Sequence, residues 1–125
     1  MIIKESAENY LESILVIKSQ KGFVRSIDIA NDLGVSKPSV SVAMKNFREE
    51  GYITVDADGN IDLTEKGLEI ANRVYERHEV VSKALMALGV CPETALEDSC
   101  KIEHIISDET FARIKELLKS KNIDF

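Results

Sequence analysis

The chain has 125 residues, of which 44% are hydrophobic, so it can form one compact domain or two small lobes but not a large multidomain enzyme. Sixteen basic and twenty-two acidic residues give a net charge of −6, which disfavours indiscriminate binding to polyanions. The sequence has two cysteines, no apolar run of about eighteen residues and no cleavable leader. These features predict a soluble cytoplasmic protein with reduced thiols, in preference to a Cys91–Cys100 disulfide.

The first third of the chain is expected to be helical. Apolar residues at helical spacing predict a first helix over residues 6–20. Ser26 is the expected N-cap of a second helix, which Gly34 ends. Ser36 and Pro38 then open a third helix, and a helix, a glycine turn and a second helix in this order are typical of a helix-turn-helix.

The third predicted helix has one apolar side and one polar side. Val35, Val40, Met44 and Phe47 are expected to form its buried stripe. The polar residues on the opposite side are candidate contacts to phosphates and base edges: Ser36, Lys37, Ser39, Ser41, Lys45 and Arg48. Any one of them could equally belong to an ordinary solvated face, so the hypothesis rests on the order of the elements.

A β-hairpin is predicted directly after the helix-turn-helix. Residues 51–55 and 61–63 are apolar enough for two short strands, and Gly59 and Asn60 suit the turn between them. A hairpin in this position is a wing. Asp56 and Asp58 at its tip would repel phosphate, so we expect the wing to contribute little to DNA binding.

The remainder of the chain is predicted to contain three helices. Thr64 caps a long helix that ends at Gly89, Pro92 opens the next, and Ser107 with Asp108 begins the last. These helices are apolar on one side and suited to dimerisation. The fold class is therefore mainly α, with a winged helix-turn-helix DNA-binding domain over residues 1–66 and a helical dimerisation domain over residues 67–125. The second domain is also expected to bind metal, because it contains a cysteine, a glutamate and a histidine at helical spacing.

Cys100, Glu103 and His104 have the spacing i, i+3 and i+4, which would place a thiolate, a carboxylate and an imidazole on one helix face. The long preceding helix carries the other histidine, His78, and is the expected antiparallel neighbour. Such mixed donors suit Fe²⁺, Mn²⁺, Co²⁺ or Zn²⁺. A lone helical histidine is usually structural, so the metal hypothesis depends on the cluster. Cys91 is interpreted as a small buried hydrophobe.

The sequence resembles the diphtheria-toxin-repressor and manganese-transport-regulator family over nearly its whole length. The resemblance is carried by the order of the predicted elements, by the helix-turn-helix segment over residues 28–41 and by four shorter segments. These are residues 8–12, 63–67, 77–78 and 100–107, the last reading Cys-Lys-Ile-Glu-His-Ile-Ile-Ser. Members are homodimeric transcriptional regulators that bind palindromic operators when loaded with Fe²⁺ or Mn²⁺. The resemblance implies that Cys100, Glu103 and His104 bind the regulatory metal.

The resemblance also implies a further ligand at position 9. Asn9 stands there, where iron-type members have Met and manganese-type members have Asp, and Glu12 or Glu8 could replace it. Manganese-type members pair Glu12 with a carboxylate at the position of Cys100. His78 matches a second iron-type site, but Ser82 and Leu96 stand where that site has an acid and a histidine.

The expected function is therefore a repressor of metal-uptake genes that depends on Fe²⁺ or Mn²⁺, with Zn²⁺, Co²⁺ or Ni²⁺ as ions that could bind in vitro. Its expected partners are a double-stranded DNA operator and a second copy of the chain, without a membrane or an organic substrate.

Two alternatives stay open. One is a winged-helix regulator that responds to a non-metal ligand. The other is a small metalloenzyme that uses the Cys/Glu/His cluster with Glu12 as general base, although the chain lacks HExxH and Cys-x-x-Cys motifs.

Overall fold

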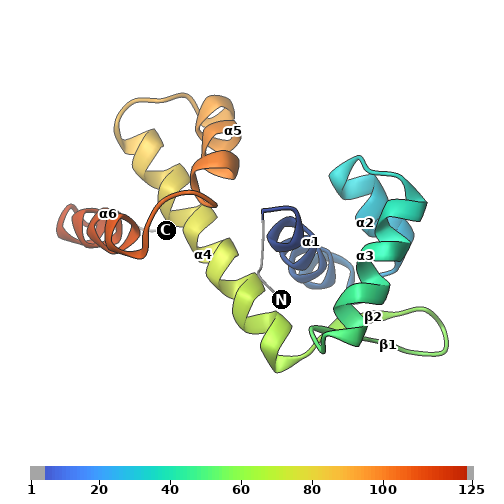
Figure 1. Ribbon diagram of the computed structural model, residues 1–125. Helices are drawn as coiled ribbons and strands as arrows, with labels where there is room; N and C mark the ends of the chain where they lie inside the picture. The colour runs from blue at the N-terminus through green and yellow to red at the C-terminus, as the bar shows by residue number, and fades with distance from the viewer. Residues whose placement is uncertain (1–4, 124–125) are drawn as a thin grey trace. The chain divides into compact units, whose positions relative to one another are not determined.

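The computed structural model describes residues 5–123, which form six helices and one two-stranded antiparallel sheet (Figure 1). In chain order the elements are α1 (Glu5–Lys21), α2 (Ser26–Leu33), α3 (Lys37–Glu49), β1 (Ile53–Val55), β2 (Ile61–Leu63), α4 (Glu65–Ala87), α5 (Pro92–Ile102) and α6 (Asp108–Ser120). One compact unit ends at Asn72 and a second begins at Arg73. The domain boundary expected at residue 66 stays a prediction. No helix in the described range is long and apolar enough to cross a membrane.

The predicted helix-turn-helix is confirmed as α2 and α3. Gly34 adopts a φ of 66°, a left-handed conformation that suits glycine, and it ends α2 as expected. Ser36 is the N-cap of α3, because its Oγ accepts a hydrogen bond from the Ser39 N–H at 3.2 Å. Pro38 lies in the first turn of α3, where its missing N–H costs no helical hydrogen bond.

The start of α2 differs from the prediction. Arg25, and not Ser26, is the N-cap residue. The carboxylate of Asp28 accepts the Arg25 backbone N–H at 2.9 Å and the Lys21 ammonium at 2.7 Å. The hydrogen bond from Lys21, followed by that from the Arg25 backbone, lowers the pKa of Asp28 below its ordinary value. An acid in the first turn therefore caps this helix end in place of a serine.

The amino-terminal unit is built around one apolar core to which all of its elements contribute. Its fully buried members include Leu11, Ile14, Val24, Ile29, Val40, Ile53, Ile61 and Ala71. Phe47 packs edge-on against the rings of Tyr10 and Tyr52, with centroid distances of 6.1 and 6.2 Å. Val35 was wrongly predicted to belong to the buried stripe of α3. It is 38% exposed, because it lies in the turn before α3 begins and does not follow the helical spacing.

The predicted wing is confirmed as the β1–β2 hairpin, in which Val55 pairs with Ile61. Asp56 shapes its turn, since its carboxylate accepts the backbone N–H groups of Asp58 and Asn60, each at 2.9 Å. Gly59 supplies the positive φ of 81° that the turn needs. The acid at position 56 is thus explained by turn geometry.

The second unit consists of the later part of α4 together with α5 and α6. Its buried apolar residues are Val74, Val80, Val81, Ala95 and Leu118. As predicted, Pro92 lies in the first turn of α5, and Ser107 caps α6 through a hydrogen bond from the Thr110 N–H to its Oγ at 3.1 Å.

At Gly67 the start of α4 lies close to the backbone of Tyr52, just before β1. Thr64 donates its backbone N–H to the Tyr52 carbonyl at 3.1 Å, and its Oγ1 accepts the Gly67 N–H at 3.2 Å. A Cβ added at Gly67 would lie 2.1 Å from the Tyr52 carbonyl oxygen. Because that oxygen belongs to the backbone, it cannot move without displacing the segment that joins α3 to β1.

We therefore predict that Gly67→Ala destabilises the protein. Helix propensity alone would favour alanine by about 1 kcal/mol. The contact with the Tyr52 carbonyl outweighs that gain, and overpacking of this kind costs about 1–3 kcal/mol. Urea unfolding followed by circular dichroism measures the change in the free energy of unfolding.

Asn72→Ala is the matched control, since Asn72 is an exposed position of the same helix. It should change stability by no more than about 0.5 kcal/mol. A Gly67→Ala variant as stable as Asn72→Ala would contradict the close approach described here.

Candidate metal centre

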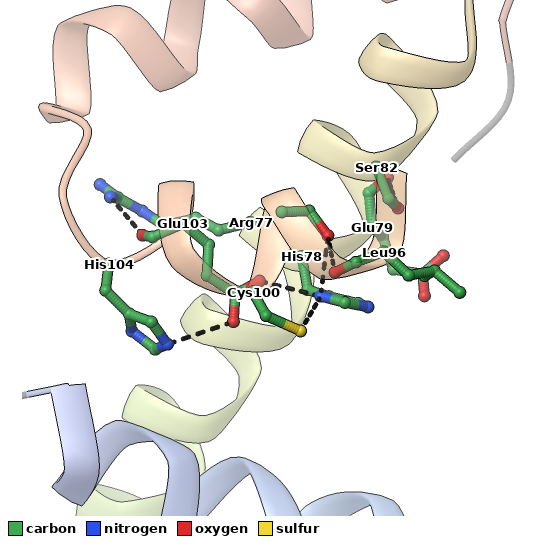
Figure 2. A network of polar contacts seen from close by, with 9 residues as sticks. Arg77, His78, Glu79, Ser82, Leu96, Cys100, Glu103 and His104 are labelled. Carbon is green, nitrogen blue, oxygen red and sulfur yellow. Dashed lines mark hydrogen bonds and ion pairs between the residues drawn. The ribbon is translucent and has the colours of Figure 1, made fainter. Parts of the chain in front are cut away.

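Three donor groups of the second unit converge on the imidazole of His78. The Glu103 Oε2 lies 2.9 Å from His78 Nδ1, and the Cys100 Sγ lies 4.0 Å from the same nitrogen. Ser99 Oγ is 3.4 Å from it. In Figure 2 the side chains of Cys100 and Glu103, at the end of α5, approach His78, which projects from α4. The other Glu103 oxygen, Oε1, lies 3.4 Å from His104 Nε2. Each of the four residues of the predicted cluster therefore contacts at least one other member.

The prediction that Cys100, Glu103 and His104 share one helix face is only partly correct. Cys100 lies on α5, but this helix ends at Ile102, Glu103 is its C-cap, and His104 lies in the following turn. The N–H groups of Ile105 and Ile106 both donate to the Ile102 carbonyl, at 3.0 and 3.1 Å, and this closes the turn. Glu103 and His104 are thus presented by a helix end and a loop rather than by one helix face.

The chemistry of this cluster fits a divalent transition metal. Glu103 is 2% exposed, although a buried carboxylate is costly unless an adjacent group compensates its charge. Imidazole and carboxylate donors bind such ions at about 2.0–2.2 Å and thiolate at about 2.3 Å, so neighbouring ligand atoms lie about 3–3.5 Å apart. The separations of 2.9 and 3.4 Å around Glu103 are of this size. The role of the four residues as ligands stays a prediction.

The two cysteines differ in their surroundings. Within the described residues neither cysteine is in a disulfide and both are exposed, so the expectation of a buried Cys91 was wrong. Cys91 is the N-cap of α5, and its Sγ donates a hydrogen bond to Thr94 Oγ1 at 3.2 Å. Hydrogen bonding with the Thr94 side chain, and then with its backbone, lowers the pKa of the Cys91 thiol. Cys91 is therefore a useful control for Cys100 in experiments on metal binding.

Four further positions correspond to ligand positions of the family: Asn9, Glu12, Ser82 and Leu96. Asn9 and Glu12 are on α1, three residues apart and therefore neighbours on its surface. Ser82 Oγ donates to the carbonyl of Glu79 on its own helix at 3.2 Å, and Leu96 is 46% exposed. Neither Ser82 nor Leu96 can replace a carboxylate or imidazole ligand. The contribution of Asn9 and Glu12 stays a prediction.

The candidate DNA contacts share one exposed surface on α3 and its N-cap. All six are solvent-exposed in the structure: Ser36, Lys37, Ser39, Ser41, Lys45 and Arg48. Lys45 and Arg48 also line a shallow pocket of about 190 Å³ with Ser26 and Ser41, beside the wing residues Val55 and Ile61. These positive and hydroxyl groups suit phosphate contacts.

Sequence reasoning assigned no role to Arg77, the residue before His78. Its guanidinium donates to the Glu103 carbonyl at 3.3 Å and to the Ile106 carbonyl at 2.9 Å. One signal was available in the sequence: Arg77 lies three residues from Val74 and from Val80, so a charge stands at a position of the apolar stripe.

Two family descriptions match almost the whole chain. Residues 3–61 match the N-terminal DNA-binding domain of iron-dependent repressors, and residues 64–124 match their metal-binding and dimerisation domain. An uncharacterized HTH-type transcriptional regulator of Methanocaldococcus jannaschii is 34% identical over 115 residues, which are 90% of this chain and 92% of that protein. The transcriptional regulator MntR of Salmonella typhimurium is 36% identical over 107 residues, 86% of this chain and 68% of that protein.

Solved structures give the same assignment. A manganese-dependent transcriptional repressor in complex with manganese matches with a TM-score of 0.81 and 26% identity, over 90% of this chain and 52% of that chain. The present chain thus spans about half of that solved chain. The two domain matches and these relatives all indicate the same family. The chain therefore belongs to the DtxR/MntR family of metal-dependent transcriptional regulators.

Proposed function

We propose that this protein is a repressor of metal-uptake genes whose affinity for a palindromic DNA operator is raised by Fe²⁺ or Mn²⁺. The observation that carries the proposal is the buried carboxylate of Glu103, which contacts the imidazoles of His78 and His104, with the Cys100 Sγ 4.0 Å from His78 Nδ1. Family membership supports a regulator rather than an enzyme. A protein that binds chromosomal operators acts in the cytoplasm.

The donor set supports a divalent transition metal without selecting one. Carboxylate and imidazole ligands suit Mn²⁺ and Fe²⁺, whereas the Cys100 thiolate favours Fe²⁺ over Mn²⁺ and would also accept Zn²⁺ or Co²⁺ in vitro. When bound, the ion would supply positive charge that compensates the buried Glu103 carboxylate. Asn9 and Glu12 are the further ligands that we propose from the resemblance.

An apolar groove in the second unit supports a homodimer. Its volume is about 430 Å³, and its walls come from α4, the end of α5, α6 and the residues after α6. Leu88 and Leu117, which line it, are 80% and 59% exposed. Apolar side chains this exposed mark interaction surfaces. Because the matching family domain is a dimerisation domain, we assign a second copy of the chain as the partner.

A symmetric dimer is expected to bind an operator that has the same twofold symmetry. Two recognition helices related by a twofold axis contact half-sites about 34 Å apart, so the operator should be an inverted repeat. Metal can change DNA affinity only if the DNA-competent arrangement binds it more tightly than other arrangements do.

We expect metal to strengthen operator binding. The probes are DNA duplexes selected from a random library. Their binding is measured with Mn²⁺, with Fe²⁺ under anaerobic conditions and with a chelator. Fluorescence anisotropy should show tighter binding with metal, within the range of about 5- to 150-fold that is common for coupled ligands. The double variant Cys100→Ala, His104→Ala should lose this difference, and Cys91→Ala should keep it. Equal affinity in metal and in chelator would rule out metal control and favour a non-metal ligand.

The exposed cations of α3 are expected to contact phosphate. Lys45→Ala and Arg48→Ala should each weaken binding to all duplexes and reduce the slope of log affinity against log salt by about 0.9 per subunit, which is about 1.8 for a dimer that carries the substitution twice. Arg113→Ala is the control, since Arg113 is an exposed cation of the other unit that pairs with Glu116. An unchanged slope in both α3 variants would exclude them as phosphate contacts.

The apolar groove is expected to be the dimer contact. Leu117→Glu places a carboxylate in this contact, and burial of an unpaired charge costs several kcal/mol. Sedimentation velocity should show a monomer for Leu117→Glu. Leu68→Glu, at an exposed leucine of the amino-terminal unit, should remain dimeric. A dimeric Leu117→Glu variant would show that the copies meet elsewhere.

A further inference from the structure

Arg77 connects three segments of the second unit through one side chain. Its Nη1 donates to the carbonyl oxygens of Glu103 and Ile106, and its Nη2 forms an ion pair with Asp108, the first residue of α6. The Phe111 ring covers the guanidinium, with Cζ 5.2 Å from the ring centroid. Arg77 therefore binds the end of α5, the connecting loop and the start of α6 at once.

These contacts are a poor source of net stability. Arg77 is 9% exposed, and a buried cation carries a large desolvation cost. Its charged partner Asp108 has a side chain that is 97% exposed, so water screens their attraction. Among the described residues Arg77 Nε has no hydrogen-bond partner. A cation that gains so little in stability at this position is better explained by the geometry that it imposes.

The geometry that Arg77 imposes is that of Glu103 and its loop. The Glu103 carbonyl is bound by Arg77, and its carboxylate contacts His78, the next residue of α4 (Figure 2). One residue is thus held at both its backbone and its side chain by two consecutive residues of one helix. The carbonyl of Ile106, beyond His104, is held by the same guanidinium, which fixes both ends of the loop.

We infer that Arg77 is a positioning residue for the metal donors, which holds residues 103–106 so that the Glu103 carboxylate contacts both His78 and His104. This inference rests on the proposed metal-dependent function. A merely structural arginine would affect the stability of the fold and leave the metal geometry unchanged. A positioning arginine affects the affinity and the coordination of the ion, because outer groups that orient ligands typically contribute about 10- to 100-fold to metal affinity.

The test compares Arg77→Met and Arg77→Lys with Arg113→Met, a matched loss of an exposed arginine on α6. Anaerobic titration with Co²⁺, followed by its visible absorption bands, reports affinity and coordination. Arg77→Met should weaken Co²⁺ binding about 10- to 100-fold and change the band pattern. Arg77→Lys should fall between it and the wild type, because lysine keeps the charge but lacks the planar fork of donors. Arg113→Met should behave as wild type.

A second measurement uses the metal-free protein. The amides of Ile105 and Ile106 both donate to the Ile102 carbonyl and should exchange slowly with deuterium in the wild type. Arg77→Met should accelerate their exchange while the amides of α1–α3 stay protected. If Arg77→Met does not fold, Arg77→Lys carries both comparisons with a smaller expected effect.

The outcomes separate this inference from the function on which it rests. Co²⁺ binding and spectrum that are the same in the Arg77 variants and in Arg113→Met would overturn the positioning role even if the wild type binds metal. Unchanged exchange at Ile105 and Ile106 would overturn it in the metal-free protein. A wild type that binds no Co²⁺, Mn²⁺ or Fe²⁺ would instead refute the proposed function, whatever the exchange rates show.

Discussion

The buried carboxylate of Glu103 is the constraint on which the second unit depends. A carboxylate removed from water requires polar partners, and here they are imidazoles on either side of it. One of these, His78, comes from α4, and the other, His104, follows Glu103 in the chain. The end of α5 must therefore stay against α4, and Arg77 acts on the same place through the Glu103 backbone.

The amino-terminal unit is organised by shorter-range interactions. Gly34 and Ser36 determine where α2 ends and α3 begins, and the core beneath them determines which side of α3 faces water. Strong local signals of this kind can be recognised in the sequence, which is why the helix-turn-helix, the wing and the helices of the second unit were predicted close to their observed bounds. Val35 was misplaced because the apolar stripe was extended beyond the residue that starts the helix.

The candidate site could be predicted only in part, for a physical reason. Spacing brought Cys100, Glu103 and His104 together as candidates, and the expected antiparallel neighbour added His78. The end of α5 at Ile102 was not predicted, because no glycine or proline marks it and the turn is closed by backbone hydrogen bonds to the Ile102 carbonyl. Arg77 was missed because its partners are backbone carbonyls 26 and 29 residues away, which carry no side-chain signal.

The overall charge of the chain must be separated from the charge of its DNA surface. A net charge of −6 would repel DNA if it were spread evenly. On α3 and its N-cap, however, Lys37, Lys45 and Arg48 are exposed together. Within the wing, Asp56 is engaged by two backbone N–H groups, so its presence reflects the turn and not a phosphate contact. Because attraction to DNA is then local and repulsion is general, the docked orientation is restricted to the one that presents α3, which favours specific over indiscriminate binding.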